Sequence, residues 1–238
     1  MSSLISLLSE QKNEGIIGRE EYLKSLAEKD KVEILVTSDS HGCKTILSSV
    51  VKKLGDECDL ICFCGDGIEE FIETIHDELK IAKNEKAFAF AQGNGDNSSC
   101  IFSVNRTNET RRTAKIFRTT KIIKIPQQVV FSVCGKNVFL THGHIFDVYY
   151  TRDFLISEMK HKNAQVAFFG HTHVPVAETE NNLTLINPGS CARPRNASPY
   201  SCAIVTIFKG ARNTECKFFD IKNGFRKFDC DSSFIRRI

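Results

Sequence analysis

The chain has 238 residues, of which 41% are apolar and 26% charged, and these values exclude a disordered or fibrous protein. The formal net charge of +3 is too small to indicate nucleic acid as the main partner. No apolar run approaches the roughly 18 residues of a membrane span, and residues 1–10 lack the early positive charge of a secretory signal. We therefore expect a soluble cytoplasmic protein without a membrane partner.

The ten cysteines fit the same expectation. Several lie inside apolar runs such as residues 60–64, and no Cys-x-x-Cys pair suggests a zinc or redox site. Buried thiols that pack as small apolar groups are common in cytosolic proteins. We interpret the ten cysteines as reduced core thiols.

Residues 2–29 predict two short helices separated around Gly15 and Gly18. They carry no pattern that suggests chemistry, so we interpret residues 1–30 as an N-terminal helical extension that packs on the body or forms a dimer contact. A homo-oligomer is therefore one expected assembly. Since no linker divides the rest, residues 31–238 are predicted to form a single domain.

Three predicted strands in the first half end in polar, glycine-rich stretches. They are residues 32–37 before Asp39 and His41, residues 59–64 before Asp66, and residues 87–91 before Asn94. Amphipathic helices follow the first two strands. Ligand sites in open α/β sheets gather in the loops at the carboxyl ends of the strands, and glycines let the backbone turn sharply there. The repetition predicts one shared site.

Residues 97–125 lack clear periodicity, and we predict no element for them. Within them, residues 106–124 include seven lysines and arginines against one acid, Glu109. A solvated surface segment is the favoured interpretation. The segment could instead attract a phosphorylated substrate, and nucleic acid is a disfavoured but open partner.

The second half is predicted to consist mostly of hairpins, with a helix over residues 152–160. The expected strand pairs are residues 129–134 with 137–141, 174–178 with 183–186, and 203–208 with 215–219, the last pair closing a second sheet. Strand–helix alternation followed by hairpins predicts an α/β protein, namely a sandwich of two mixed sheets with helices outside.

Histidines are concentrated at two later strand ends. His142 and His144 follow the strand over residues 137–141, and His171 and His173 follow the apolar run 165–169. If strand geometry continued through residues 171–173, both imidazoles would point to one face, because side chains alternate along a strand. In that geometry the His-x-His sequence would provide a pair of metal ligands.

Seven nitrogen and oxygen donors thus lie at predicted strand ends: Asp39, His41, Asp66, Asn94, His142, His171 and His173. A donor set without thiolates suits two divalent transition metals rather than a structural zinc. Two such ions, with one carboxylate bridging them, would lower the pKa of a shared water and neutralise phosphoryl oxygens during attack. The set therefore predicts hydrolysis of phosphate esters.

These motifs, in this order, resemble those of the calcineurin-like metallophosphoesterases, and especially the small bacterial and archaeal phosphodiesterase branch. The match covers about residues 31–220 and includes Thr141-His142-Gly143-His144 and Asn187-Pro188-Gly189-Ser190. The resemblance implies a four-layer α/β/β/α sandwich of two mixed sheets. It also implies a phosphodiesterase that hydrolyses small phosphodiester or nucleotide-like substrates by attack of a metal-bridging hydroxide.

The resemblance also implies roles for single residues. One metal would be held by Asp39, His41, Asp66 and His173, and the other by Asp66, Asn94, His142 and His171, with Asp66 as the bridge. The implied catalytic residues are Asn94, His41 and His144, the last as a contact to ligands or substrate or else a plain structural histidine. We expect Mn(II), with Fe(II), Zn(II) and Ni(II) as alternatives.

Two positions depart from the protein phosphatases of this family. Their asparagine precedes a histidine that helps to protonate the leaving group, whereas Asn94 precedes Gly95. General acid catalysis contributes ~10² to 10⁴-fold, so we expect a preference for good leaving groups unless His41, His144 or the substrate supplies the proton. Protein phosphatases also have an arginine after the second aspartate, and this chain lacks it. Here Asp66 is followed by Glu69 and Glu70, which are near the start of a predicted helix.

Three alternatives stay open. The first is a non-catalytic interaction scaffold, the role for which the retromer subunit of this fold is chiefly known. The others are a phosphomonoesterase and a nuclease that would use the basic segment 106–124.

Overall fold

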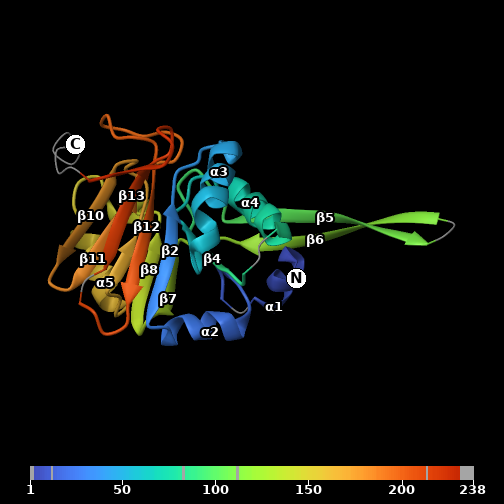
Figure 1. Ribbon diagram of the computed structural model, residues 1–238, viewed down its shortest axis with the longest axis horizontal. Coiled ribbons are helices and arrows are strands. Elements are labelled where there is room, and N and C mark those ends of the chain that lie inside the picture. Colours follow the sequence, from blue (N-terminus) through green and yellow to red (C-terminus); the bar gives the residue numbers. More distant parts are fainter. Residues whose placement is uncertain (1–2, 12, 82–83, 111–112, 213, 231–238) are drawn as a thin grey trace.

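A computed structural model describes residues 3–11, 13–81, 84–110, 113–212 and 214–230. Two β-sheets are packed face to face and helices cover their outer faces, while one long hairpin extends far beyond the rest of the molecule (Figure 1). The sheets contain seven and five strands, and the hairpin forms a separate two-stranded sheet.

The seven-stranded sheet has the order β1-β4-β3-β2-β12-β13-β14. Its strands are β1 (Ile16–Ile17), β2 (Lys31–Thr37), β3 (Leu60–Phe63), β4 (Ala87–Phe90), β12 (Ser201–Phe208), β13 (Glu215–Asp220) and β14 (Arg226–Phe228). Strands β2, β3 and β4 are parallel, whereas β12 pairs antiparallel with β2. The predicted antiparallel pair of residues 203–208 and 215–219 is confirmed. The prediction that this pair closes a second sheet is wrong, because β12 adds to the edge of β2 in the first sheet.

The five-stranded sheet has the order β10-β11-β9-β8-β7. Its strands are β7 (Gln128–Val133), β8 (Lys136–Thr141), β9 (Val166–Phe168), β10 (Pro175–Glu180) and β11 (Leu183–Pro188). The two predicted hairpins β7–β8 and β10–β11 are confirmed. Asn181 and Asn182, which connect the second hairpin, both have the positive φ that a tight two-residue turn requires.

Three apolar clusters separate the four layers. The helices are α1 (Leu4–Glu10), α2 (Glu20–Glu28), α3 (Lys44–Leu54), α4 (Ile68–Ile81) and α5 (Asp153–His161), with short 3₁₀ turns η1 (Gly55–Glu57) and η2 (His144–Phe146). Along β2, Ile34 and Val36 face the five-stranded sheet, and Leu35 packs under α3 and α4. Leu155 of α5 covers the other outer face. The predicted four-layer sandwich of two mixed sheets is confirmed.

The N-terminal segment is integrated into the first sheet. Its two predicted short helices are present as α1 and α2, and between them β1 pairs antiparallel with β4. Leu4 and Leu7 are buried in the cluster that contains α4. A separate N-terminal extension and a homo-oligomer both stay predictions.

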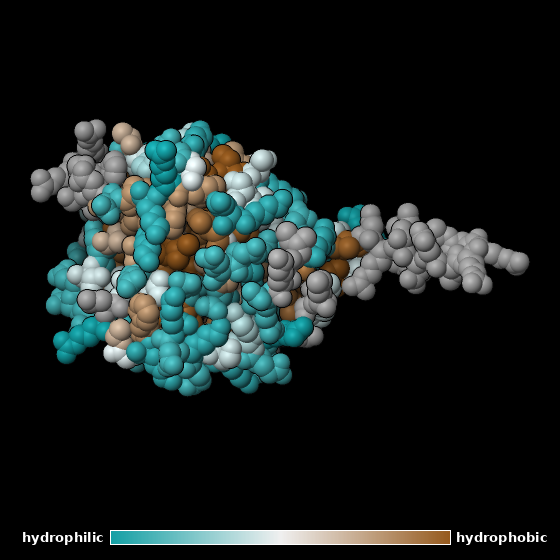
Figure 2. All heavy atoms as spheres, viewed as in Figure 1, coloured by the Kyte–Doolittle hydropathy of each residue, from teal (hydrophilic) through white to brown (hydrophobic). Residues whose placement is uncertain are grey.

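The basic segment forms the long hairpin of β5 (Ser99–Thr110) and β6 (Thr113–Lys124), which we had not predicted. Cys100, Phe102 and Ile123 at its base are buried in the core, whereas Ile101 and Ile122 on the opposite face are each 72% exposed. Arg111 and Arg112 lie outside the described residues, as do the side chains of residues 105–117, so the predicted surface role of the basic segment stays a prediction. Figure 2 shows hydrophobic residues, in brown, where the base of the hairpin joins the body of the molecule.

All ten cysteines are free thiols, and seven of them are buried. For these seven cysteines the packing confirms the predicted core thiols, whereas Cys43, Cys216 and Cys230 are only partly buried. Among the described residues, no helix combines the length and the apolar character that crossing a membrane would require.

Candidate metal centre

The loops at the strand ends have an unusual backbone. Five of the seven predicted ligands have positive φ values between 41° and 68°: Asp39, His41, Asp66, His171 and His173. Non-glycine residues seldom adopt this left-handed conformation, and it concentrates at functional sites. Strand β9 ends at Phe168, so the strand geometry that we considered for residues 171–173 does not occur. The turns, and not strand alternation, aim these two histidines.

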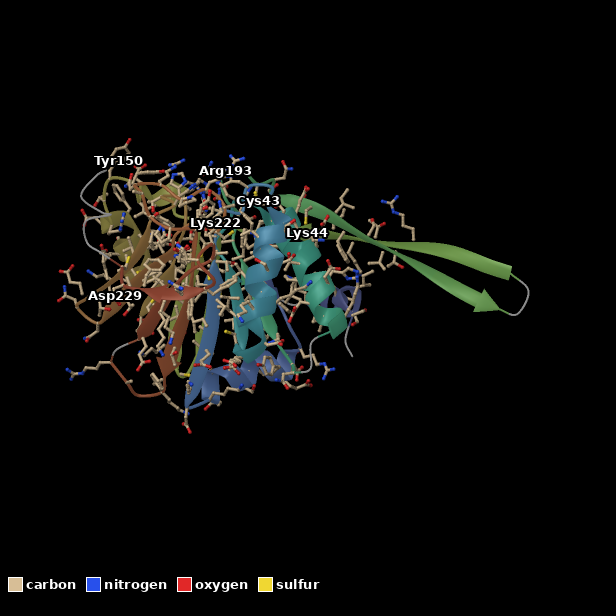
Figure 3. All side chains as sticks on the ribbon, turned by 45° about the horizontal axis from the view of Figure 1, so that its top comes forward. Cys43, Lys44, Tyr150, Arg193, Lys222 and Asp229 are labelled. Atoms are coloured by element: carbon tan, nitrogen blue, oxygen red, sulfur yellow. The ribbon has the colours of Figure 1, made fainter. Side chains whose placement is uncertain are left out.

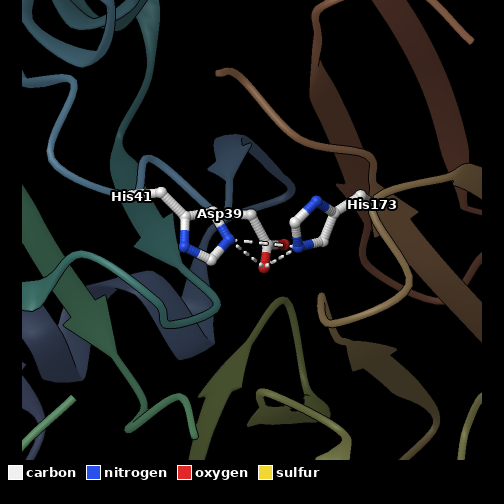
Figure 4. A group of neighbouring side chains, drawn as sticks. All are labelled: Asp39, His41 and His173. Carbon is white, nitrogen blue, oxygen red and sulfur yellow. Dashed lines mark hydrogen bonds and ion pairs between the residues drawn. The ribbon is translucent and has the colours of Figure 1, made fainter. Parts of the chain in front are cut away.

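Three of the predicted ligands form a first group, drawn in Figure 4: Asp39, His41 and His173. The Nε2 atoms of the two histidines are 3.1 Å apart, and Asp39 Oδ1 lies 3.2 Å from His173 Nε2 and 3.8 Å from His41 Nε2. Asp39 is fully buried, and its Oδ2 accepts a hydrogen bond from Ser38 Oγ. Three potential ligand atoms thus converge on one point.

The second group surrounds Asp66. Asp66 Oδ2 lies 3.6 Å from His142 Nε2, and Asn94 Oδ1 lies 3.2 Å from the same nitrogen. The ring centroid of His171 is 5.1 Å from that of His142. Asp66 Oδ2 is also 3.7 Å from His41 Nε2 in the first group. The fold therefore brings all seven predicted residues to one place.

Backbone carbonyls fix the orientation of two imidazoles. His142 Nδ1 lies 2.7 Å from Cys64 O, and His173 Nδ1 lies 2.5 Å from Arg193 O. Because a carbonyl oxygen only accepts, each Nδ1 must carry the proton and donate it. In the neutral ring, each Nε2 then directs a lone pair into the site, the arrangement usual for metal-bound histidines.

Burial favours the neutral form of two of these rings, those of His171 and His41. The pKa of His171 is lowered to about 4, mainly by burial and then by the nearby His142. The pKa of His41 is lowered, with burial as the main cause. For His173, burial also lowers the pKa, but the nearby carboxylate of Asp39 outweighs it and raises the pKa overall. His171 is therefore a neutral donor over the physiological range.

The donor set fits divalent cations. Two groups of three, Asp39 with His41 and His173, and Asp39 with Asp66 and His142, have ligand atoms within 4.8 Å of one another. Asp39 Oδ1 is buried without a hydrogen-bond partner in the described part of the chain, although it lies 3.2 Å from His173 Nε2. A buried, unsatisfied carboxylate oxygen is costly, and a cation at this point would remove that cost.

Asp96 is a site residue whose structural role we did not predict. Its Oδ1 accepts hydrogen bonds from the backbone N–H groups of Gly67 and Ile68. Its Oδ2 accepts from those of Asp66 and Gly93. One carboxylate thus caps α4 and joins the loop of Asp66 to the loop of Asn94. Its place directly after Gly93-Asn94-Gly95 is the signal that could have identified it.

Ser190 supports the site from the loop that follows β11. Its hydroxyl donates to Asp39 O over 2.8 Å and accepts from Arg193 N over 2.7 Å. Arg193 in turn lines a cavity together with His41 and Asp66. Ser190 belongs to a motif that the resemblance included, whereas nothing in the sequence pattern indicated Arg193.

His144 lies beside the ligands in η2. Its ring centroid is 5.4 Å from that of His142 and 6.1 Å from that of His171. Its Nδ1 is buried without a hydrogen-bond partner among the residues that the structure describes. The pKa of His144 is lowered by burial and by His142. The position fits a contact to ligands or substrate, and that role stays a prediction.

Similarity to known proteins agrees with this site. A sequence from Bacillus subtilis named as a metallophosphoesterase, YsnB, is 28% identical over 189 residues, which cover 79% of this chain and 91% of that protein. The phosphodiesterase MJ0936 of Methanocaldococcus jannaschii is 25% identical over 162 residues, which cover 67% of this chain and 84% of that protein.

A solved structure shares the fold. Vacuolar protein sorting 29 from Cryptosporidium parvum superimposes with a TM-score of 0.59 at 16% identity, covering 84% of this chain and 96% of that one. At that identity the likeness concerns the fold alone. The family model described as the calcineurin-like phosphoesterase superfamily domain matches residues 32–210, which contain all seven clustered donors. The chain therefore belongs to the calcineurin-like phosphoesterase superfamily.

Proposed function

We propose that this chain is a phosphodiesterase that uses two divalent metal ions, with Mn(II) as the expected metal. One ion would be held by Asp39, His41, Asp66 and His173, and the other by Asp66, Asn94, His142 and His171. When bound, the two ions would supply an activated water and neutralise the phosphoryl oxygens. Nitrogen and oxygen donors without thiolate suit Mn(II), Fe(II), Zn(II) or Ni(II).

The position of Asp66 is the observation that carries the proposal. Its Oδ2 lies at nearly equal distances from His41 Nε2 and His142 Nε2, 3.7 and 3.6 Å. An oxygen shared by two histidine groups is suited to bridge two ions. Its Oδ1 is held separately by the backbone N–H of Gly95 at 2.7 Å. The carboxylate is therefore oriented before any ligand arrives.

The chain's own residues would orient the substrate. Asn94 is exposed at the mouth of the second group, where its amide can contact a phosphate oxygen. Arg193 adds a positive charge on the first group's side. Gly95 offers no side chain to protonate a leaving group, so aryl diesters should react faster than alkyl diesters unless His41 or His144 supplies the proton.

The substitution Asp66→Asn tests the proposal. It keeps the acceptor for Gly95 N–H but removes the shared negative oxygen, so we expect hydrolysis of bis(p-nitrophenyl) phosphate with Mn(II) to fall at least about a hundredfold. The far-UV circular dichroism spectrum should stay unchanged. Asp56→Asn, at an exposed position in η1, is the matched control and should keep full activity. Wild-type activity in Asp66→Asn would overturn the proposal.

Comparing p-nitrophenyl phosphate with the diester tests the choice between a monoesterase and a diesterase. We expect the diester to have the higher kcat/KM, because a monoester carries an additional negative charge into a site that already contains several carboxylates. A strong preference for the monoester would favour the phosphomonoesterase.

The likeness to vacuolar protein sorting 29 keeps the interaction scaffold as the second candidate. Two observations weigh against it. A scaffold without metal would gain nothing from an unsatisfied Asp39 Oδ1 in a buried site, nor from five left-handed residues around it. Partner binding without any uptake of Mn(II) would favour the scaffold.

A further inference from the structure

A cavity of about 390 Å³ opens directly beside the metal centre. His41 and Asp66, two of the proposed metal ligands, line one side of it. The rest of the lining comes from the first turn of α4, residues 95–97 and the base of β5, together with Gly42, Ile125 and Arg193. Its volume is within the range of small-molecule sites. A phosphodiester whose phosphorus sits at the metal centre would place one of its two alcohol arms here.

Two carboxylates of α4, those of Glu69 and Glu70, line this cavity. In the described part of the chain, neither forms an ion pair with a lysine or arginine. Glu73, one turn later, differs because it pairs with Lys44 at 3.0 Å. The negative charges of Glu69 and Glu70 are therefore available to a ligand.

The fold makes room for Glu70 at the cavity wall. Its Oε1 lies 3.8 Å from where a Cβ on Gly42 would be, and its Oε2 lies 3.0 Å from where a Cβ on Gly67 would be. The same Cβ on Gly67 would collide with Ser40 Oγ. That hydroxyl is fully buried and has no hydrogen-bond partner within the described residues. An unsatisfied hydroxyl and a carboxylate without a cationic partner thus both approach Gly67.

The start of α4 is already capped by another carboxylate, so the helix dipole is not the only interaction open to these two acids. Asp96 already caps α4, with its Oδ1 2.8 Å from Gly67 N and 3.0 Å from Ile68 N. Additional carboxylates near a capping carboxylate gain less from the helix dipole and repel it. A positively charged ligand between them would relieve this repulsion.

Arg193 is the one lysine or arginine among the described lining residues. Figure 3 shows it at the same end of the molecule as Cys43, which directly follows the loop of His41 and Gly42. The arginine near the metal centre can bind the anionic phosphate of the substrate, whereas the two glutamates of α4 can bind a positively charged group. The cavity therefore matches a zwitterionic diester better than one with a second anionic group.

We infer that the cavity beside the metal centre binds an alcohol arm that carries a positive charge, so that the preferred substrates are phosphodiesters of cationic amino alcohols. This inference rests on the proposed phosphodiesterase function. It predicts discrimination against nucleotide-like arms that bear a further phosphate, because that phosphate would meet Glu69 and Glu70.

The test compares two esters that differ by one charge. p-Nitrophenyl phosphorylcholine has a trimethylammonium group, and p-nitrophenyl 3,3-dimethylbutyl phosphate has an uncharged tert-butyl group of the same shape. Both release nitrophenolate, so the difference does not depend on a proton donor. With Mn(II)-loaded protein we expect kcat/KM to be at least fivefold higher for the cationic ester. The ratio should shrink as salt is raised.

Substitutions assign the preference to the two acids. In Glu69→Gln, in Glu70→Gln and most strongly in the double variant, the ratio of the two kcat/KM values should fall towards one. Glu73→Gln removes an acid from the same helix outside this cavity and should leave the ratio unchanged. The two esters are compared within each variant, so a general loss of activity does not disturb the ratio.

Each other outcome has a defined meaning. A wild-type ratio of one or below, or a ratio that persists in the double variant, would overturn the inference and leave the phosphodiesterase intact. Failure of the wild-type protein to hydrolyse both esters and bis(p-nitrophenyl) phosphate would overturn the proposed function, and the inference with it.

Discussion

At the scale of single residues, the site depends on backbone strain that its neighbours hold in place. Left-handed residues such as Asp39 and Asp66 each cost of the order of 1–3 kcal/mol. Hydrogen bonds to the same loops offset this cost: Ser190 Oγ holds Asp39 O, and the carboxylate of Asp96 holds Asp66 N. These supporting residues are as important to the geometry as the ligands themselves.

Asp96→Asn should disrupt this support. The amide can still accept at one position, but its NH₂ group would face two backbone N–H donors that now bind Asp96. We expect unfolding in urea to show a loss of about 2–4 kcal/mol, together with weaker binding of Mn(II). Asn97→Ala, at the next and exposed position, is the control. Unchanged stability in Asp96→Asn would contradict the structural role of Asp96.

Residues that directly follow predicted strands were the part of the site that the sequence could predict. Asp39, Asp66 and Asn94 each follow an apolar strand among glycines, and parallel strands bring such ends together. Arg193 and Glu70 reach the same place from a loop and from the face of a helix, and no local pattern reports that. The turns that aim His171 and His173 could not be predicted either, since left-handed φ values at non-glycine residues have no reliable sequence signal.

At the scale of elements, the β5–β6 hairpin shows why a strand can escape prediction. At its base, Cys100 and Phe102 face the core while Ile101 faces outward, 72% exposed. Apolar residues on both faces remove the alternation that marks a half-buried strand. The place of β12 was missed for another reason: its pairing with β2 joins residues about 170 positions apart, and local sequence does not encode that partner.

The outer part of the hairpin should be dispensable for the fold. Joining Val104 to Thr119, which are register partners, through an Asn-Gly turn removes residues 105–118 and keeps the buried base. We expect the melting temperature to change by no more than about 2 °C and hydrolysis of small diesters to persist.

Phe102→Ala provides the contrast, because this side chain is only 8% exposed. Its loss should cost about 3–4 kcal/mol and lower the melting temperature by roughly 10 °C. If instead the shortened hairpin lost diester hydrolysis while the protein stayed folded, the outer hairpin would have to take part in substrate binding. Salt-sensitive binding of oligonucleotides by the full chain would then support the nuclease.

At the scale of the whole molecule, two sheets cooperate to build one centre. The seven-stranded sheet provides Asp39, His41, Asp66 and Asn94 from loops after its parallel strands, and the five-stranded sheet provides His142, His171 and His173. The apolar cluster between the sheets fixes the distance between these two sets. Predicted ligands that are far apart in the sequence therefore converge on one centre.

The central claim is that these two sets hold two metal ions that are required for hydrolysis. The most direct measurement is to strip the protein with a chelator, remove the chelator, and titrate Mn(II) while recording both bound metal and hydrolysis of bis(p-nitrophenyl) phosphate. We predict no hydrolysis in the stripped protein and a rise that reaches its plateau at two ions per chain. Full hydrolysis by the stripped protein would contradict this claim. So would hydrolysis that reaches its plateau while no Mn(II) is bound.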